Sequence, residues 1–136
     1  MDDKKNGILE RLKHSVQLLA SPAEVQLGLL PAFVCKPDEL ALEFDHWWEV
    51  TRSNYGAILS ADEQSALIAI QQKLTWLTQN AKQEWTDEAV TNSPHWQEIR
   101  DLALRALNAF GWPMEVPPSY SSEYVSEHRF RRHSHN

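Results

Sequence analysis

Apolar residues recur every three or four positions along four long stretches of the 136-residue chain. In the first stretch, for example, Ile8, Leu12 and Val16 follow one another at intervals of four. Side chains with this spacing lie on one face of an α-helix and form an apolar stripe. The pattern therefore predicts four principal helices, at residues 6–20, 37–56, 61–80 and 93–110.

Residues that favour helix ends mark the borders of these stretches. Three serines stand where the N-cap of a helix is expected: Ser21, Ser60 and Ser93. The first two have glutamate three residues later, which is the capping-box pattern. A short helix is expected after the first serine, up to about Gly28, and a single turn after Thr86. Two glycines occupy C′ positions and are expected to end their helices: Gly56 and Gly111.

The remaining segments are expected to be non-helical. Residues 29–35 are apolar but interrupted by a proline, so we expect a buried connector that crosses the core, with a short strand as the alternative. Residues 112–125 are rich in aromatic residues and proline, and we expect an extended segment that packs back onto the helices. Residues 126–136 form a basic, His-rich tail that we expect to be disordered. The predicted fold is an all-α bundle of about four principal helices, as one domain over residues 1–125.

The stretch 37–55 combines acidic and aromatic residues more densely than any other part of the chain. At 100° per residue, one side of its helix carries the large apolar side chains, including Leu40, Phe44 and Trp48. The opposite side carries mainly acids, and we expect it to be exposed to water: Asp38, Glu39, Asp45, His46 and Glu49. The helix is therefore predicted to have a core face and an acidic face.

The net charge of the chain is −6, and the charged residues are distributed unevenly along it. Residues 37–101 hold four Lys or Arg against twelve Asp or Glu, a net charge of −8. Such a segment repels phosphate groups, so nucleic acid is not expected as a direct partner. The excess of acids favours a basic protein partner, and it also serves solubility.

Cysteine usage and hydropathy indicate the compartment. Cys35 is the single cysteine, so no internal disulfide is possible and a reducing, cytoplasmic location is expected. No stretch approaches the length of a membrane span or the apolar core of a signal peptide. We expect Cys35 to be buried and inert within the apolar connector.

Glu43 and His46 form a Glu-x-x-His pattern, which places a carboxylate and an imidazole one helical turn apart. Di-iron carboxylate bundles use this spacing, but they need a second such pair and two further glutamates. The other predicted helices do not supply these residues. A metal site centred on Glu43 and His46 therefore stays an alternative, and no cofactor or catalytic residue is predicted.

The six tryptophans divide between core and surface. We expect Trp47 and Trp96 to lie in the core, whereas Trp76 falls opposite the apolar stripe of its helix. Burial of Trp76 against a neighbouring segment is the expectation, and a contact surface is the alternative. Tryptophans beside acids make a good site for a basic peptide or protein.

Three stretches carry a resemblance: LASPAEVQLGLLPAFVCKPDELALEFD, LSADEQSALIAIQQKL and EWTDEAVTNSPHWQEIRDLALRALNAFGW. Their overall pattern is similar to that of small uncharacterised bacterial helical proteins, including ones thought to be immunity proteins of toxin systems. The resemblance covers about residues 19–112. It implies an all-helical fold and a toxin domain as partner, and it assigns no functional residues.

These observations favour a non-enzymatic module that binds a basic protein through the acidic face of the helix at 37–55. Seven residues are predicted to contact the partner: Asp38, Glu39, Asp45, Glu49, Asp62, Glu63 and Trp76. Besides the metal site at Glu43 and His46, a homo-oligomeric structural or regulatory subunit with Trp76 at the interface is a further alternative.

Overall fold

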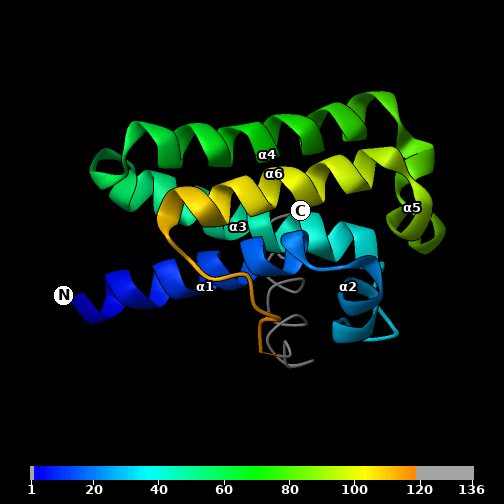
Figure 1. Ribbon diagram of the computed structural model, residues 1–136, viewed down its shortest axis with the longest axis horizontal. Coiled ribbons are helices and arrows are strands. Elements are labelled where there is room, and N and C mark those ends of the chain that lie inside the picture. Colours follow the sequence, from blue (N-terminus) through cyan, green and yellow to red (C-terminus); the bar gives the residue numbers. More distant parts are fainter. Residues whose placement is uncertain (1, 119–136) are drawn as a thin grey trace, which may run out of the picture.

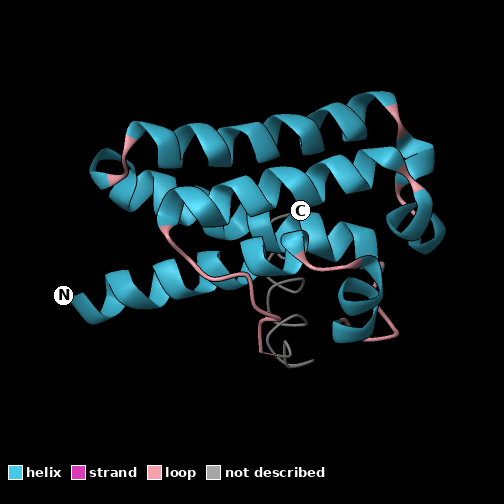
Figure 2. Cartoon of the chain, viewed as in Figure 1, coloured by secondary structure: helices cyan, strands magenta, loops and turns pink. Residues whose placement is uncertain are grey.

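The computed structural model describes residues 2–118, and among these it contains six α-helices, two 3₁₀ helices and no strand (Figure 2). The α-helices are α1 (Asp2–Ala20), α2 (Ala23–Leu29), α3 (Lys36–Tyr55), α4 (Ala61–Asn80), α5 (Asp87–Asn92) and α6 (Pro94–Phe110). The 3₁₀ helices are η1 (Gly56–Ile58) and η2 (Lys82–Glu84). The predicted all-α bundle with four long helices is confirmed. The expectations for residues 119–125 and for the basic tail at 126–136 lie outside the described residues.

The four long helices run in alternating directions and form the body of the bundle (Figure 1). α1 packs against both α3 and α6, and α6 packs in turn against α4. α2 and α5, with η2, gather at the right-hand end of the view in Figure 1, and η1 joins α3 to α4 at the opposite end. α1, the first helix, therefore depends on α6, the last one, for one of its two long contacts.

The apolar stripes of the long helices meet in one core. Its largest fully buried side chains include Trp96 and Phe44, and each buried residue of this size adds about 1.5–3 kcal/mol of stability. Trp96 was predicted there correctly. Of the adjacent pair in α3, however, Trp48 is the deep residue and Trp47 is half-buried. Trp48 points toward α4, where its Nε1 donates to Oε1 of Gln71 at 3.1 Å.

The predicted helix starts are mostly confirmed. Ser60 and Glu63 form a complete capping box before α4. Thr86 caps α5, and Ser93 caps α6 by accepting a hydrogen bond from the amide of His95. The capping box predicted at Ser21 is wrong, because its hydroxyl donates instead to the carbonyl of Gln17 in the preceding helix at 2.7 Å.

The two predicted terminal glycines behave differently. Gly111 adopts a left-handed conformation with φ of 70°, and the amide of Trp112 bonds back to the carbonyl of Leu107 at 2.9 Å. The chain then turns back toward α1, where Nε2 of Gln17 donates to the carbonyl of Pro113 at 2.9 Å. α3 ends at Tyr55, next to Gly56 as predicted, but Gly56 has a right-handed φ of −55° instead of the left-handed conformation of a terminating glycine, and the chain continues directly into η1.

The connector before α3 does not cross the core, contrary to the sequence prediction. Leu30 and Val34 are buried, but Phe33 between them is 67% exposed and Cys35 is exposed. Two apolar side chains are enough to hold this short turn against the helices. The segment therefore lies along the surface, and the thiol was wrongly expected to be buried.

A buried polar network ties α2, α5 and α6 together. Arg100 of α6 is only 7% exposed, and its NH1 donates to Oε1 of Gln26 at 3.1 Å and to the carbonyl of Val90 at 3.0 Å. The amide of Gln26 in turn donates to the carbonyls of Leu18 and Leu19, at 3.1 and 2.9 Å. These carbonyls belong to the last turn of α1, which lacks intrahelical donors. Burial lowers the pKa of Arg100 from its usual value, because desolvation disfavours the charged form.

Candidate functional site: the exposed face of α3

Three acids of α3 share one exposed side of the helix. Asp38, Asp45 and Glu49 are all exposed, and they are spaced by seven and four residues. Such spacings return to the same helical face, so the three carboxylates follow a line along the helix. Over eleven residues this line is roughly 16 Å long. We call Asp38, Asp45 and Glu49 the acidic stripe.

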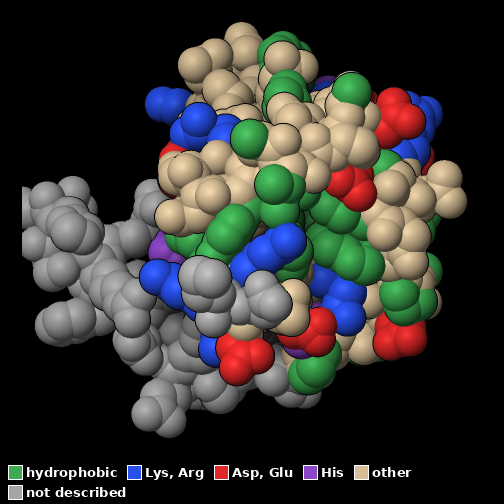
Figure 3. All heavy atoms as spheres, turned by 90° about the vertical axis from the view of Figure 1, so that its left-hand side faces the viewer, with side chains coloured by type: hydrophobic (Ala, Val, Ile, Leu, Met, Phe, Trp, Pro, Cys, Tyr) green, Lys and Arg blue, Asp and Glu red, His purple; other side chains and the backbone are tan. Residues whose placement is uncertain are grey.

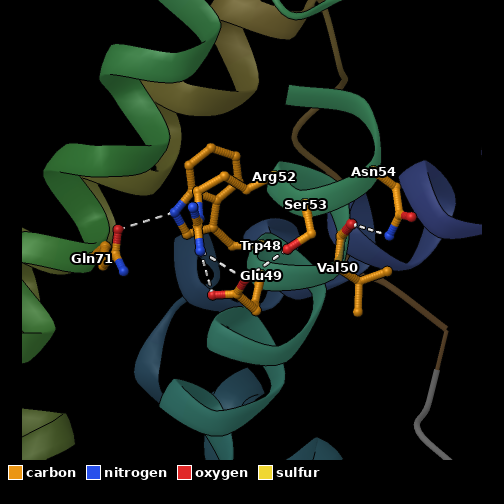
Figure 4. Close-up of polar contacts among 7 residues, drawn as sticks. All are labelled: Trp48, Glu49, Val50, Arg52, Ser53, Asn54 and Gln71. Atoms are coloured by element: carbon orange, nitrogen blue, oxygen red, sulfur yellow. Dashed lines mark hydrogen bonds and ion pairs between the residues drawn. The ribbon is translucent and has the colours of Figure 1, made fainter. Parts of the chain in front are cut away.

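Glu49 is held in place by its own helix (Figure 4). Both of its carboxylate oxygens accept from NH2 of Arg52 at 2.7 Å, and Oε2 also accepts from the hydroxyl of Ser53 at 2.8 Å. The hydrogen bond from Arg52, followed by that from Ser53, holds the pKa of Glu49 below its ordinary value. Glu49 therefore stays ionised, although Arg52 offsets part of its charge.

Glu39 does not belong to this stripe, and its predicted exposure is wrong. Its side chain is 1% exposed, as is that of Glu43 one turn later. Both lie on the flank of α3 next to the apolar row of Leu40 and Phe44. The buried arc of α3 is thus wider than its row of apolar residues, and it includes these two carboxylates.

The two acids predicted at the start of α4 have different roles. Oε1 of Glu63 accepts from the amide of Ser60 at 2.8 Å, and the hydroxyl of Ser60 accepts from the amide of Glu63 at 3.1 Å. Glu63 is half-buried and is occupied by this capping box. Asp62 is exposed in the same first turn, where a negative charge stabilises the helix dipole.

Trp76 is 43% exposed, so the expectation that a neighbouring segment buries it is wrong. Its ring contacts the ammonium of Lys73, 4.6 Å from the ring centroid, and the ring of His95 in α6, with centroids 5.1 Å apart. Nζ of Lys73 also approaches Nδ1 of His95 at 2.9 Å and Oε1 of Glu98 at 3.0 Å. Trp76 therefore belongs to the seam between α4 and α6, apart from the acidic stripe.

The alternative metal site lacks further ligands in the part of the chain that is described. Glu43 is buried and His46 is half-buried, with the His46 ring edge-on to Trp47 at a centroid distance of 4.5 Å. Among residues 2–118 no group of three or more His, Cys, Asp or Glu side chains is placed to hold a metal ion. The structure thus brings no second Glu-x-x-His pair to these two residues.

Cys35 is exposed but is not activated as a nucleophile. Desolvation, as the main cause, raises the pKa of its thiol above the ordinary value, and Asp38 contributes smaller effects of both signs. A raised pKa lowers the fraction of thiolate, which is the reactive form. The thiol therefore offers little nucleophilic chemistry at neutral pH.

In comparisons with known proteins, no family model, no curated protein and no solved structure matches the chain. The resemblance to immunity proteins thus stays a prediction from the sequence pattern. Within residues 2–118, none of the helices is both long and apolar enough to cross a bilayer.

Proposed function

We propose that this protein is a non-enzymatic binding module that recognises a basic protein through the acidic stripe of α3. The observation that carries the proposal is the alignment of three exposed carboxylates on one helix face. The net charge of −8 over residues 37–101 extends the negative field beyond the stripe. Complementary charge of this kind accelerates association and selects partners.

The predicted contact set becomes smaller in the light of the geometry. Glu39 is buried, and Glu63 is half-buried within its capping box, so neither is expected to contact a partner, whereas Glu49 stays exposed although Arg52 and Ser53 bond to it. The predicted contacts that remain are Asp38, Asp45 and Glu49 on α3, and Asp62, which is exposed in the first turn of α4. The similarity to immunity proteins favours a toxin domain as the basic partner, in a reducing cytoplasmic compartment.

A capture experiment tests this proposal. The full-length protein is immobilised and exposed at low salt to lysate of its native host, and bound proteins are eluted with salt and identified. The double variant Asp45→Lys/Glu49→Lys is compared with Glu88→Lys/Asp101→Lys, which changes the net charge equally at exposed positions of α5 and α6. We expect a basic protein that is retained by the wild type and the control but lost with the α3 variant. Equal retention by both variants contradicts a role for the stripe.

A second proposal rests on the exposure of Trp76. In it the protein is a homo-oligomeric subunit, because a large aromatic ring at the surface is a good anchor for an interface. Sedimentation of the wild type and of Trp76→Gln tests it. A wild-type mass of one chain at high concentration rules the oligomer out.

A further inference from the structure

A cleft of about 470 Å³ opens at the end of the bundle where η1 lies, between α1, η1 and the end of α6. Figure 3 views the molecule from this end and shows hydrophobic side chains in a hollow, with Lys or Arg side chains next to them. The volume falls within the range of about 300–1,000 Å³ that is typical of small-molecule sites. We call this feature the η1 cleft.

Apolar and aromatic side chains line much of the η1 cleft. Ile58 of η1 is 58% exposed, and the rings of Phe110 and Trp112 stack with centroids 4.0 Å apart and planes at 8°. The stack exists because the left-handed turn at Gly111 folds Trp112 back over the end of α6. An exposed apolar hollow of this kind is costly in water and favours occupation by an apolar group.

The charged groups of the η1 cleft leave one cation available. Glu10 is engaged by Nζ of Lys13 at 2.9 Å and by Nε2 of His14 at 3.9 Å. The carboxylate of Glu63 is held by the amide of Ser60. Lys5, which also lines the cleft, has no hydrogen-bond or ion-pair partner in the described part of the chain. A ligand that enters the cleft therefore meets an apolar wall and the ammonium group of Lys5, which no described side chain engages directly.

We propose that the η1 cleft binds a small aromatic carboxylate. The ring of the ligand packs against Ile58, Phe110 and Trp112, and its carboxylate pairs with Lys5. The two elements of recognition are the apolar lining and the ammonium group of Lys5, which come from different elements of the bundle. This site is separate from the acidic stripe, since none of the three stripe residues lines the cleft.

The probe for the test is indole-3-acetate, with the uncharged indole-3-acetamide as a matched ligand of nearly the same shape. Both are titrated into the ¹⁵N-labelled full-length protein, and amide signals are followed by NMR. We expect saturable shifts at Lys5, Ile58 and Trp112, with a dissociation constant on the order of 1 mM for a ligand this small. The neutral amide is expected to bind about 2- to 5-fold more weakly, which is the usual contribution of an exposed charge pair.

Two variants separate the parts of the site. Lys5→Met should weaken the carboxylate about 2- to 5-fold and remove the difference between the two ligands. Lys82→Met is the control, because Lys82 is an exposed lysine of η2 at the opposite end of the bundle. Ile58→Ser should weaken both ligands alike. The NMR spectra also report whether each variant is folded.

The proposal is overturned if the carboxylate and the amide bind equally well, if the shifts spread over other faces, or if Lys82→Met weakens binding as much as Lys5→Met. The charge reversal at Asp45 and Glu49 should leave probe binding within about 2-fold, because these residues lie outside the cleft. The two proposals can thus fail independently.

Discussion

The two ends of the bundle have recesses of nearly equal size and opposite chemistry. The η1 cleft, of about 470 Å³, is lined by five apolar or aromatic side chains together with two lysines, two glutamates and an asparagine. At the other end, η2, α5 and the start of α6 surround a recess of about 460 Å³ that is lined mainly by polar residues. Volume therefore does not distinguish these recesses, and what each can bind depends on the groups that line it.

The difference arises from how each end is held together. At the α5 end the polar groups bond to one another: Ser93 donates to Glu84, and the indole of Trp96 donates to the carbonyl of Glu84 at 2.7 Å. The buried Arg100 network lies nearby. At the η1 end the helices are joined by a single short turn, and the apolar side chains around it remain partly exposed. Hydrogen bonds between side chains and backbone thus join the segments at the α5 end, whereas the η1 end retains exposed apolar surface.

Arg100→Met is expected to have the largest effect on stability, because it removes the centre of the buried polar network at the α5 end of the bundle. It leaves the carbonyl of Val90 and the side chain of Gln26 buried without their donor. Loss of such partners should lower the free energy of unfolding by about 2–4 kcal/mol. Urea unfolding measures the change. Arg105→Met, at an exposed arginine of the same helix, should change it by less than about 0.5 kcal/mol, and equal losses would contradict the role of the network.

Gln26→Leu should lower the free energy of unfolding by a smaller amount, about 1–3 kcal/mol. It removes the side-chain amide that donates to the last turn of α1. Residues in one network are coupled, so the double variant with Arg100→Met should lose less stability than the two single variants added together. A double-mutant cycle by urea unfolding gives the coupling energy. Strict additivity would show that the two side chains act separately.

Ile58→Ala tests the η1 end of the bundle, where we expect apolar side chains to contribute little to stability. Its side chain is already 58% exposed, so the free energy of unfolding should change by no more than about 0.5 kcal/mol. The same substitution at Ile70, which is fully buried in α4, should cost about 2–5 kcal/mol. A large loss at Ile58 would mean that the cleft residues serve the core instead of a ligand.

The smallest effect concerns the titration of His14, beside the η1 cleft. Desolvation lowers the pKa of His14 from 6.5, and the neighbouring Glu10 opposes this shift only partly. The folded state thus disfavours protonation, so the contribution of His14 to stability is complete above pH 6.5 and is lost as the pH falls through its folded-state pKa. An NMR titration of the ring protons should give a midpoint below 6.5, and Glu10→Gln should lower it further. A midpoint above 6.5 contradicts the burial of this ring.

The sequence predicts features that depend on neighbouring residues. The caps at Ser60, Thr86 and Ser93 and the left-handed turn at Gly111 all follow from local patterns, and the structure has them. The cap fails at Ser21, where the hydroxyl has a closer acceptor in the preceding helix. Local signals therefore predict helix ends well unless a competing partner lies within a turn.

Burial of polar residues could not be predicted in the same way. Periodicity identifies the apolar row of α3, but the width of its buried arc depends on which segments pack beside it, and so Glu39 was placed on the wrong face. Arg100 and Gln26 are 74 positions apart, and no local pattern links them. The η1 cleft likewise exists only once four elements, α1, η1, α4 and α6, have come together. The acidic stripe, in contrast, follows from spacing alone.

The pairing of α1 with the end of the chain has a consequence for synthesis on the ribosome. Gln17 reaches its bonding partner Pro113 only after 96 further positions have been added. At about 5–20 residues per second, this takes roughly 5 to 20 s. Through that interval α1 can pack on α3, but the apolar surface meant for α6 stays uncovered. The nascent chain therefore exposes an apolar face of α1 to the solvent until its last helix has emerged.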